Sequence, residues 1–224
     1  MFPLPVIVVN FKSYREASGE RGLELARIAQ EVSEESGVTI AVAPQMVDLA
    51  LVVREVKIPV FAQHIDTVKT GSYTGSTTLN AVKEAGAVGS LLNHAEKRIK
   101  ASEIDEIITE MNREEMVSIL CTNNYAVSKA LSLLSPTFIA IEPPELIGGD
   151  VSVTTAKPEI ITRVVKSVEK LAPEVGVLTG AGVKTSKDVR RALELGCDGV
   201  LLASGVVKSD NPRKTLEDLA SGVD

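Results

Sequence analysis

The sequence predicts an α/β fold, a single (β/α)8 barrel that occupies residues 1–224 as one domain. Three observations lead to this prediction: eight short apolar runs rich in β-branched residues, an amphipathic stretch after each run, and a regular spacing. The runs recur roughly every 28 residues, which is the length of one strand and one crossover helix. A chain of 224 residues is long enough for one such barrel and leaves little room for a second domain.

The apolar runs are nearly continuous, as expected for parallel strands that are covered on both faces. They are Val6–Val9, Val38–Ala43, Pro59–Ala62, Ala87–Leu92, Met116–Cys121, Thr137–Ile141, Val175–Leu178 and Gly199–Leu202. The stretches between them have apolar residues at three- and four-residue intervals, which is typical of helices that pack on a sheet. They are Gly22–Ser33, Met46–Val56, Thr77–Ala85, Ser102–Asn112, Tyr125–Leu134, Lys157–Leu171, Ser186–Leu195 and Pro212–Ala220. Strict alternation of strands and helices fits an open doubly wound sheet or a closed barrel, and eight such units favour the barrel.

Composition and charge exclude several classes of protein. Hydrophobic residues make up 44% of the chain and charged residues 24%, so a buried core is expected and disorder is not. A net charge of -6 without any basic run argues against a nucleic-acid partner. Cys121 and Cys197 lack the spacing of a metal site or a disulfide framework and fit a reducing compartment. No basic leader or apolar stretch of about 18 residues is present, so no membrane association and a cytoplasmic location are expected.

Polar and small residues follow the predicted strands at their carboxyl ends, where barrels of this kind carry their chemistry. Asn10-Phe11-Lys12 follows the first strand, Asn93-His94-Ala95-Glu96 the fourth and Glu142-Pro143-Pro144 the sixth. A Lys, a His and a Glu at one mouth can bind an anion, polarise a carbonyl and remove a proton. After strands seven and eight, Gly180-Ala181-Gly182 and Ala203-Ser204-Gly205 leave backbone N–H groups free for a phosphate. The pattern predicts a small phosphorylated ligand without naming it.

Each of these residues also has a structural interpretation. Taken alone, His94 could be a structural residue, Lys12 a solvated loop residue, and the glycines ordinary turns before helices. Glu142 is harder to explain in this way, because a carboxylate that ends an apolar run is costly without a function or a partner. His64 is a second candidate electrophile, although its apolar setting favours a structural or interface role. For Cys121 we expect a small packed side chain.

Four segments, in this order along the chain, resemble motifs of the triosephosphate isomerase family, particularly of its short archaeal form. They are Asn10-Phe11-Lys12, Gly71-Ser72-Tyr73-Thr74-Gly75, Asn93-His94-Ala95-Glu96 and the segment from Ala140 to Gly148. The resemblance covers essentially the whole chain. It implies a TIM barrel that interconverts D-glyceraldehyde 3-phosphate and dihydroxyacetone phosphate through an enediolate, in glycolysis and gluconeogenesis, with no metal or organic cofactor.

The resemblance also implies a role for each residue at the mouth. Glu142 would be the base that moves a proton between neighbouring carbons. His94 would be a neutral electrophile, with a helix that begins near Ala95 lowering its pKa. Lys12 would place a positive charge beside the enediolate and the phosphate. Asn10 would help to fix the substrate oxygens and to orient Lys12.

The resemblance also implies that backbone N–H groups bind the phosphate. The residues are Ile147, Gly148, Gly182, Ala203 and Ser204, with Ser204 capping a short helix. The segment 143–149 would act as a lid that excludes water from the enediolate. Glu96 would pair with a nearby cation.

The chain departs from the family pattern in several places. Ala95 replaces the usual Ser, the loop after strand seven lacks its usual serine, and Ala203-Ser204 stands where a glycine pair is common. The lid ends in Gly148-Gly149-Asp150 instead of Gly-Thr-Gly. We therefore expect phosphate contacts that depend more on backbone, and altered lid kinetics.

The long third loop, residues 64–76, resembles the arm by which a subunit of this family reaches its neighbour, where Thr74 would approach Asn10 and Lys12. A homo-oligomer is expected, at least a dimer, and the archaeal resemblance favours a tetramer. Two alternative functions were weighed. Another phosphate-binding barrel, of amino-acid or thiamine biosynthesis, would carry further acids or a metal-binding carboxylate pair at the mouth. A non-catalytic sugar-phosphate binder would not need a base.

Overall fold

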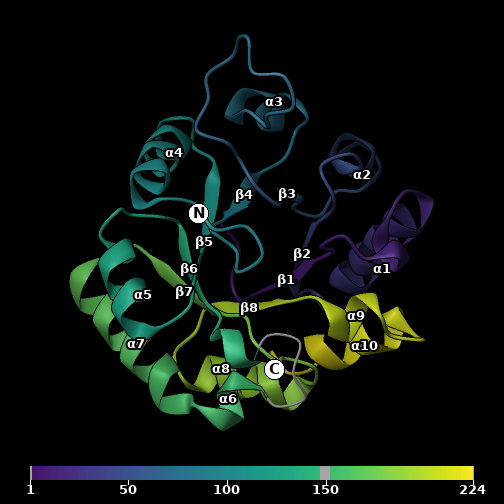
Figure 1. Cartoon of the computed structure of the whole chain (residues 1–224). Helices are drawn as coiled ribbons and strands as arrows, with labels where there is room; N and C mark the ends of the chain where they lie inside the picture. The colour runs from purple at the N-terminus through teal and green to yellow at the C-terminus, as the bar shows by residue number, and fades with distance from the viewer. Residues whose placement is uncertain (1, 147–151, 224) are drawn as a thin grey trace.

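The structure is a computed structural model that describes residues 2–146 and 152–223, apart from the side chain of Glu145, and it confirms the barrel (Figure 1). The strands are β1 (Val6–Asn10), β2 (Thr39–Ala43), β3 (Phe61–Ala62), β4 (Gly89–Leu92), β5 (Val117–Thr122), β6 (Phe138–Ile141), β7 (Gly176–Thr179) and β8 (Gly199–Leu202). All pair in parallel, in the order β2-β1-β8-β7-β6-β5-β4-β3. A parallel bridge between Val42 and Val60 joins β2 to the start of β3, so the sheet closes on itself.

Helices surround the ring of strands (Figure 1). The α-helices are α1 (Glu20–Ser36), α2 (Leu49–Glu55), α3 (Leu79–Glu84), α4 (Ala101–Arg113), α5 (Tyr125–Ser132), α6 (Val153–Ala156), α7 (Pro158–Leu171), α8 (Ser186–Glu194), α9 (Ser204–Val207) and α10 (Pro212–Ala220). Two 3-10 turns, η1 (Arg15–Ala17) and η2 (Pro144–Leu146), follow β1 and β6. Within the described ranges, no helix combines the length and the apolar character that a membrane crossing requires.

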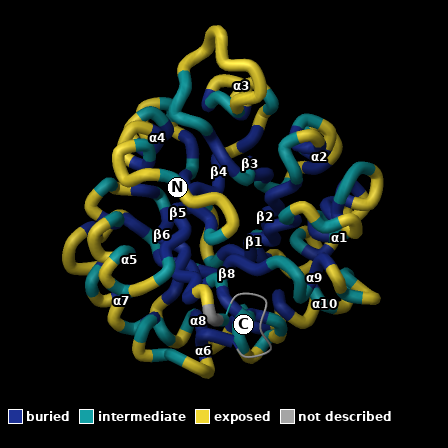
Figure 2. Tube along the Cα trace, viewed as in Figure 1, coloured by how far each residue is buried: buried dark blue, intermediate teal, exposed yellow. Residues whose placement is uncertain are grey.

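Side chains alternate between the barrel interior and the layer beneath the helices, because successive residues of a strand point to opposite faces. On β1, Val6 and Val8 pack inside the barrel, whereas Ile7 and Val9 belong to the core between strands and helices. Figure 2 shows the buried strands at the centre and the exposed surface on the outer helices. This alternation decides which residues after the strands reach the mouth.

The predicted elements agree with the observed ones except at ends and in short pieces. The third strand is shorter than predicted, because only Phe61 and Ala62 form it and Val60 contributes the bridge alone. The helix predicted from Met46 begins at Leu49, after a turn in which the N–H of Asp48 donates to the carbonyl of Gln45. The sequence prediction did not contain the four-residue helix α6 or the 3-10 turns η1 and η2, whereas the short helix expected at Ser204 is α9.

Candidate active site

Glu142 lies at the carboxyl end of β6, where it continues the inward alternation of Phe138 and Ala140. Its backbone N–H donates to the carbonyl of Thr122 at 2.8 Å, which fixes the turn out of the strand. The residue is 4% exposed, and among the described residues its Oε2 atom has no hydrogen-bond partner. Burial raises the pKa of Glu142 to about 7, although the Cys121 thiol and the charge of Lys12 act to lower it. The result is a buried carboxyl group that can take or release a proton near neutral pH.

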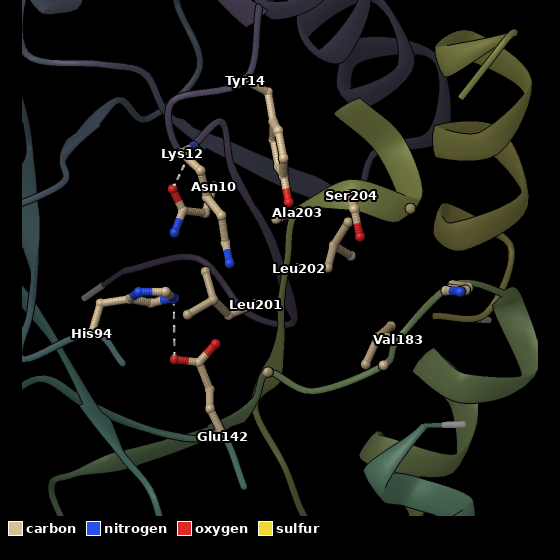
Figure 3. A pocket seen from close by; sticks show the side chains of 14 residues that line it. Asn10, Lys12, Tyr14, His94, Glu142, Val183, Leu201, Leu202, Ala203 and Ser204 are labelled. Carbon is tan, nitrogen blue, oxygen red and sulfur yellow. Dashed lines mark hydrogen bonds and ion pairs between the residues drawn. The ribbon is translucent and has the colours of Figure 1, made fainter. Parts of the chain in front are cut away.

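His94 lies opposite Glu142, with its Nε2 atom 3.8 Å from Glu142 Oε2 (Figure 3). The backbone N–H of Glu96 donates to His94 Nδ1 at 3.2 Å, so Nδ1 carries the lone pair and the ring proton sits on Nε2. The Glu96 carboxylate also lies 3.5 Å from Nδ1, a contact that would suit only a protonated ring. The backbone contact decides the tautomer, because burial, together with the charge of Lys12, lowers the pKa of His94 to about 4. The neutral imidazole therefore presents an N–H donor to the mouth.

The expectation that a helix begins near Ala95 is wrong. His94 is followed by a turn in which the N–H of Lys97 donates to the His94 carbonyl at 2.9 Å, and α4 begins only at Ala101. Asn93 has a φ of 55°, and its side chain donates to the Cys121 carbonyl at 3.0 Å. This left-handed residue turns the chain at the end of β4, and burial together with nearby charge, without a helix terminus, accounts for the pKa of His94.

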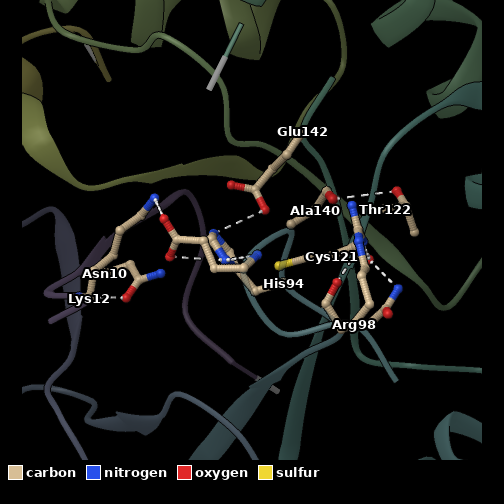
Figure 4. Close-up of polar contacts among 10 residues, drawn as sticks. Asn10, Lys12, His94, Arg98, Cys121, Thr122, Ala140 and Glu142 are labelled. Carbon is tan, nitrogen blue, oxygen red and sulfur yellow. Dashed lines mark hydrogen bonds and ion pairs between the residues drawn. The ribbon is translucent and has the colours of Figure 1, made fainter. Parts of the chain in front are cut away.

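Lys12 is also held in a left-handed conformation, with a φ of 48°. Its N–H donates to Asn10 Oδ1 at 2.9 Å and its carbonyl accepts from Gln63 Nε2 at 3.0 Å, so both sides of the residue are fixed. Figure 4 shows Lys12 next to Asn10. The ammonium group of Lys12 lies 2.9 Å from Glu96 Oε1. Asn10 thus orients Lys12 and Glu96 pairs with a cation, as expected from the sequence.

The small residues expected to bind phosphate lie on the opposite wall of the same pocket. Gly182, Ala203 and Ser204 line it together with Asn10, Lys12, His94 and Glu142. Ser204 does not cap the short helix: Ala203 occupies the N-cap position, and Ser204 is the first residue of α9. The first N–H groups of a helix have no partner within the helix, so this wall offers backbone donors.

The lid segment is described only in part. Pro143 is buried and the half-buried Leu146 packs on the core between strands and helices. Ile147 and Gly148, and with them the lid end Gly148-Gly149-Asp150, lie outside the described residues.

Sequence reasoning missed several residues at the mouth. Tyr14, Val183 and Lys184 line the pocket. Arg98, whose Nη1 donates to the Asn93 carbonyl at 2.6 Å, lowers the pKa values of His94 and Glu142 by its charge. Tyr14 follows Lys12 by two residues, and Val183 and Lys184 directly follow Gly182, so each stood beside a predicted site residue. Arg98 carried no such signal, because its approach to Glu142 joins distant segments of the chain.

The fold and the pocket together define a class of protein, the (β/α)8-barrel enzymes that transfer protons on small anionic substrates. The sequence model of the triosephosphate isomerase family matches residues 5–221. A triosephosphate isomerase of Methanothermus fervidus is 51% identical over 215 residues, which cover 96% of this chain and 97% of that protein. Those of Methanothermobacter thermautotrophicus and Methanocaldococcus jannaschii are 50% and 49% identical, over 98% and 96% of this chain and 96% and 98% of theirs.

The chain belongs to the triosephosphate isomerase family.

Proposed function

We propose that this chain interconverts D-glyceraldehyde 3-phosphate and dihydroxyacetone phosphate, with Glu142 as the base and His94 as the electrophile. One observation supports this assignment above the others. A buried carboxyl group with a pKa of about 7 faces, across 3.8 Å, an imidazole whose proton sits on the facing nitrogen. The separation exceeds a hydrogen bond, so neither group is held by the other and both remain available to a ligand at the mouth. The family supplies the reaction, which belongs to glycolysis and gluconeogenesis.

In the proposed mechanism, Glu142 takes a proton from the carbon beside the carbonyl. The electron pair left behind forms a carbon–carbon double bond, and the carbonyl oxygen becomes the oxyanion of an enediolate. His94 donates its Nε2 hydrogen bond to the two oxygens while the hydroxyl proton passes from one to the other. Glu142 then returns its proton to the neighbouring carbon, so that one carboxylate serves both halves of the reaction.

Lys12 supports this chemistry through its charge. Its ammonium group lowers the pKa values of both Glu142 and His94, which shows that its field reaches both groups. A fixed positive charge at a partly buried mouth stabilises an enediolate more than it stabilises a neutral carbonyl. Glu96 and Asn10 keep that charge in place.

The phosphate would lie against the small residues of the opposite wall. Gly182, Ala203 and Ser204 line the pocket and would offer backbone N–H groups, and Asn10 would contact the substrate oxygens. Ile147 and Gly148 are proposed as further donors on the resemblance alone. The side-chain hydroxyl of Ser204 is one more donor at this wall.

The test of the base is Glu142→Asp, which withdraws the carboxylate by one methylene. We expect kcat for glyceraldehyde 3-phosphate to fall by about 100-fold, with a much smaller change in KM, because misplacement by ~1 Å costs a rate factor of that order. Glu106→Asp, the same change at an exposed position of α4, is the matched control and should leave kcat unchanged. Unchanged turnover in Glu142→Asp would remove Glu142 from the mechanism.

We also propose that the chain is one domain, lies in the cytoplasm and assembles into a homo-oligomer, with a tetramer favoured by the archaeal resemblance. The third loop, residues 64–76, supports assembly. Its part from 67 to 76, here called the arm, stands out between β3 and α3 and is largely exposed (Figures 1 and 2). At its tip Tyr73 is 51% exposed, and a pocket beside the mouth contains Val47, which is 86% exposed. At the base of the arm, Asp66 Oδ2 accepts the N–H of Thr77 at 2.7 Å, and Asp66 Oδ1 lies 2.9 Å from His64 Nε2.

The assembly proposal is tested by sedimentation equilibrium of the unmodified chain and of Tyr73→Ala. We expect an oligomer that shifts toward smaller species in the variant, because an aromatic side chain at an interface contributes strongly to its stability. Leu4→Ala, an exposed apolar residue near the N-terminus, is the control and should leave the distribution unchanged. A monomeric unmodified chain would contradict the proposal.

A further inference from the structure

Tyr14 is a pocket residue whose chemistry the proposed function leaves unused. It lies in the loop after β1, two residues beyond Lys12, and lines the same pocket as Glu142 and Ser204. Its carbonyl accepts from the N–H of Ala17 at 3.1 Å and from the hydroxyl of Ser18 at 3.0 Å, so the backbone of the residue is held by η1. Figure 3 shows the ring directed with its hydroxyl end toward Ala203, which lines the same pocket.

The ammonium group of Lys208 packs on the ring of Tyr14. Its Nζ atom lies 4.4 Å from the centroid of the Tyr14 ring, which is a cation–π distance. Lys208 directly follows α9, and its N–H donates to the Ser204 carbonyl at 3.1 Å. The same contact therefore ties the loop that carries Lys12 to the helix that begins at the phosphate wall. It also brings a positive charge to this side of the pocket.

A phosphate dianion needs donors, and this pocket is poor in side-chain hydroxyl groups. The loop after β7 offers Gly180, Ala181 and Gly182, and the loop after β8 offers only Ser204. The phenol of Tyr14 can donate, and among the described residues it has no hydrogen-bond partner of its own. Hydrogen bonds to a charged acceptor are roughly twice as strong as neutral ones. A free phenol at this wall is therefore well suited to a phosphate oxygen.

We propose that Tyr14 is a substrate-binding residue whose hydroxyl donates a hydrogen bond to the phosphate group of the triose phosphate, with Lys208 holding its ring in place. This inference rests on the proposed function and deepens it, because it assigns a side chain to the phosphate. It explains how a pocket that lacks the usual serine after strand seven still presents hydroxyl donors to the dianion.

The decisive variant is Tyr14→Phe, which keeps the ring and its contact with Lys208 and removes only the oxygen. We expect KM for glyceraldehyde 3-phosphate and the inhibition constant of phosphoglycolate to rise about tenfold, which is the loss of one hydrogen bond to a charged group. We expect kcat to change by less than about twofold, because the lost contact is equal in the ground and transition states. Tyr125→Phe, at a tyrosine on α5 that contacts Arg163, is the matched control and should change nothing.

Unphosphorylated glyceraldehyde separates phosphate binding from a structural role. Tyr14→Phe should leave kcat/KM for this truncated substrate unchanged, since no phosphate is present to lose. A second variant, Lys208→Met, keeps an apolar stem over the ring and removes the charge. It should raise KM two- to threefold at low salt and less at high salt, because exposed charges are screened.

Two results would overturn the inference: an unchanged KM and inhibition constant in Tyr14→Phe, or an equal loss of activity toward glyceraldehyde. Both can occur while the unmodified chain isomerises triose phosphates and Glu142→Asp is impaired, so the proposed function would stand. If the unmodified chain does not isomerise triose phosphates, the proposed function itself fails. Equal melting temperatures of the variants and the unmodified chain would show that folding is not the cause of any change.

Discussion

Glu142 and His94 have pKa values displaced in opposite directions by the same cause, burial, because burial disfavours the charged form of each. The carboxyl group, with a pKa of about 7, becomes a stronger base toward carbon acids than an exposed glutamate. The imidazole, with a pKa of about 4, remains neutral over the whole range in which that base is active. A neutral donor and an activated acceptor therefore coexist above pH 7.

The Cys121 thiol lies against Glu142 and stabilises its charged form, while its own pKa is raised well above 9.0, so it stays protonated. The proposed mechanism needs Glu142 ionised, so activity should fall as the pH drops below about 7. Cys121→Ala removes a stabilising contact of the carboxylate. We therefore expect the pKa of Glu142 to rise further and this acid limb to move to higher pH.

The measurement that checks this is carboxyl carbon NMR of the free protein labelled at glutamate, because the second ionisation of a substrate phosphate, near pH 6, would overlap a kinetic profile. Glu142→Gln identifies the resonance by its loss. Cys197→Ala, another buried thiol far from the mouth in sequence, is the control and should leave the titration unchanged. A Glu142 resonance that titrates at an ordinary carboxyl pKa, or one that Cys121→Ala does not move, would contradict the prediction.

At the scale of elements, the loop after β7 has a second role besides its proposed contact with the phosphate. A Cβ atom added at Gly180 would lie 2.6 Å from Glu142 Cγ and 2.9 Å from Glu142 Oε1. Gly180 follows the inward-facing Leu178 by two residues, so its missing side chain leaves the space in which the base sits. The glycine expected from the sequence to expose backbone donors thus also makes room for the carboxylate of a neighbouring strand.

Gly180→Ala should therefore impair catalysis by displacing Glu142. We expect kcat to fall by about 10- to 100-fold, since misplacement of a base by ~1 Å costs up to that factor. The melting temperature should change little, because the displaced group can move toward the open mouth. Gly205→Ala, whose added Cβ would meet no atom closer than 3.4 Å, is a control at the same mouth. A Gly180→Ala variant with full kcat would show that Glu142 adapts without loss.

The sequence predicted elements well where they are long and periodic. All eight strands and eight helices were identified because continuous apolar runs and three- to four-residue periodicity are visible without coordinates. The helix α6 was missed, since four residues are too few for a period, and the equally short α9 was expected only through the family resemblance. The false helix at Ala95 has another cause, because it rests on the family resemblance. The periodic pattern itself begins at Ser102, close to the start of α4 after Lys100, whose N–H is capped by Glu103.

For the candidate site, the alternation of the strands was enough to bring Asn10 and Glu142 to one mouth. The contacts of Tyr14 with Lys208 and of Cys121 with Glu142 could not be predicted in this way. Each joins residues from different βα units, so their approach depends on the register and closure of the whole barrel. Such contacts follow from the fold and have no local signal in the sequence.

At the scale of the whole molecule, the two ends of the barrel differ: one carries the candidate site and the other is closed by packing. The carboxyl ends of the strands carry two of the described non-glycine residues with positive φ, Lys12 and Asn93, as expected where backbone strain supports function. On the outer surface, Arg213 of α10 pairs with Glu31 and Glu35 of α1, so ion pairs join the last helix to the first. The opposite end is closed by aromatic packing, in which Phe2 makes tilted and edge-on contacts with rings inside the barrel.

Phe2 lies 5.9 Å from the ring centroids of both Phe61 and Phe138, which occupy the amino ends of β3 and β6. Phe2→Ala should lower the free energy of unfolding by about 2 kcal/mol, less than for a fully buried phenylalanine because Phe2 is only half-buried. Urea unfolding at one fixed protein concentration measures this, with Phe2→Leu, which keeps most of the bulk, as the milder comparison. Because residues at this end contribute to stability and not to chemistry, kcat and KM should stay unchanged in both variants. A fall in kcat that parallels the loss of stability would show instead that packing at the closed end controls the geometry of Glu142 and His94 at the mouth.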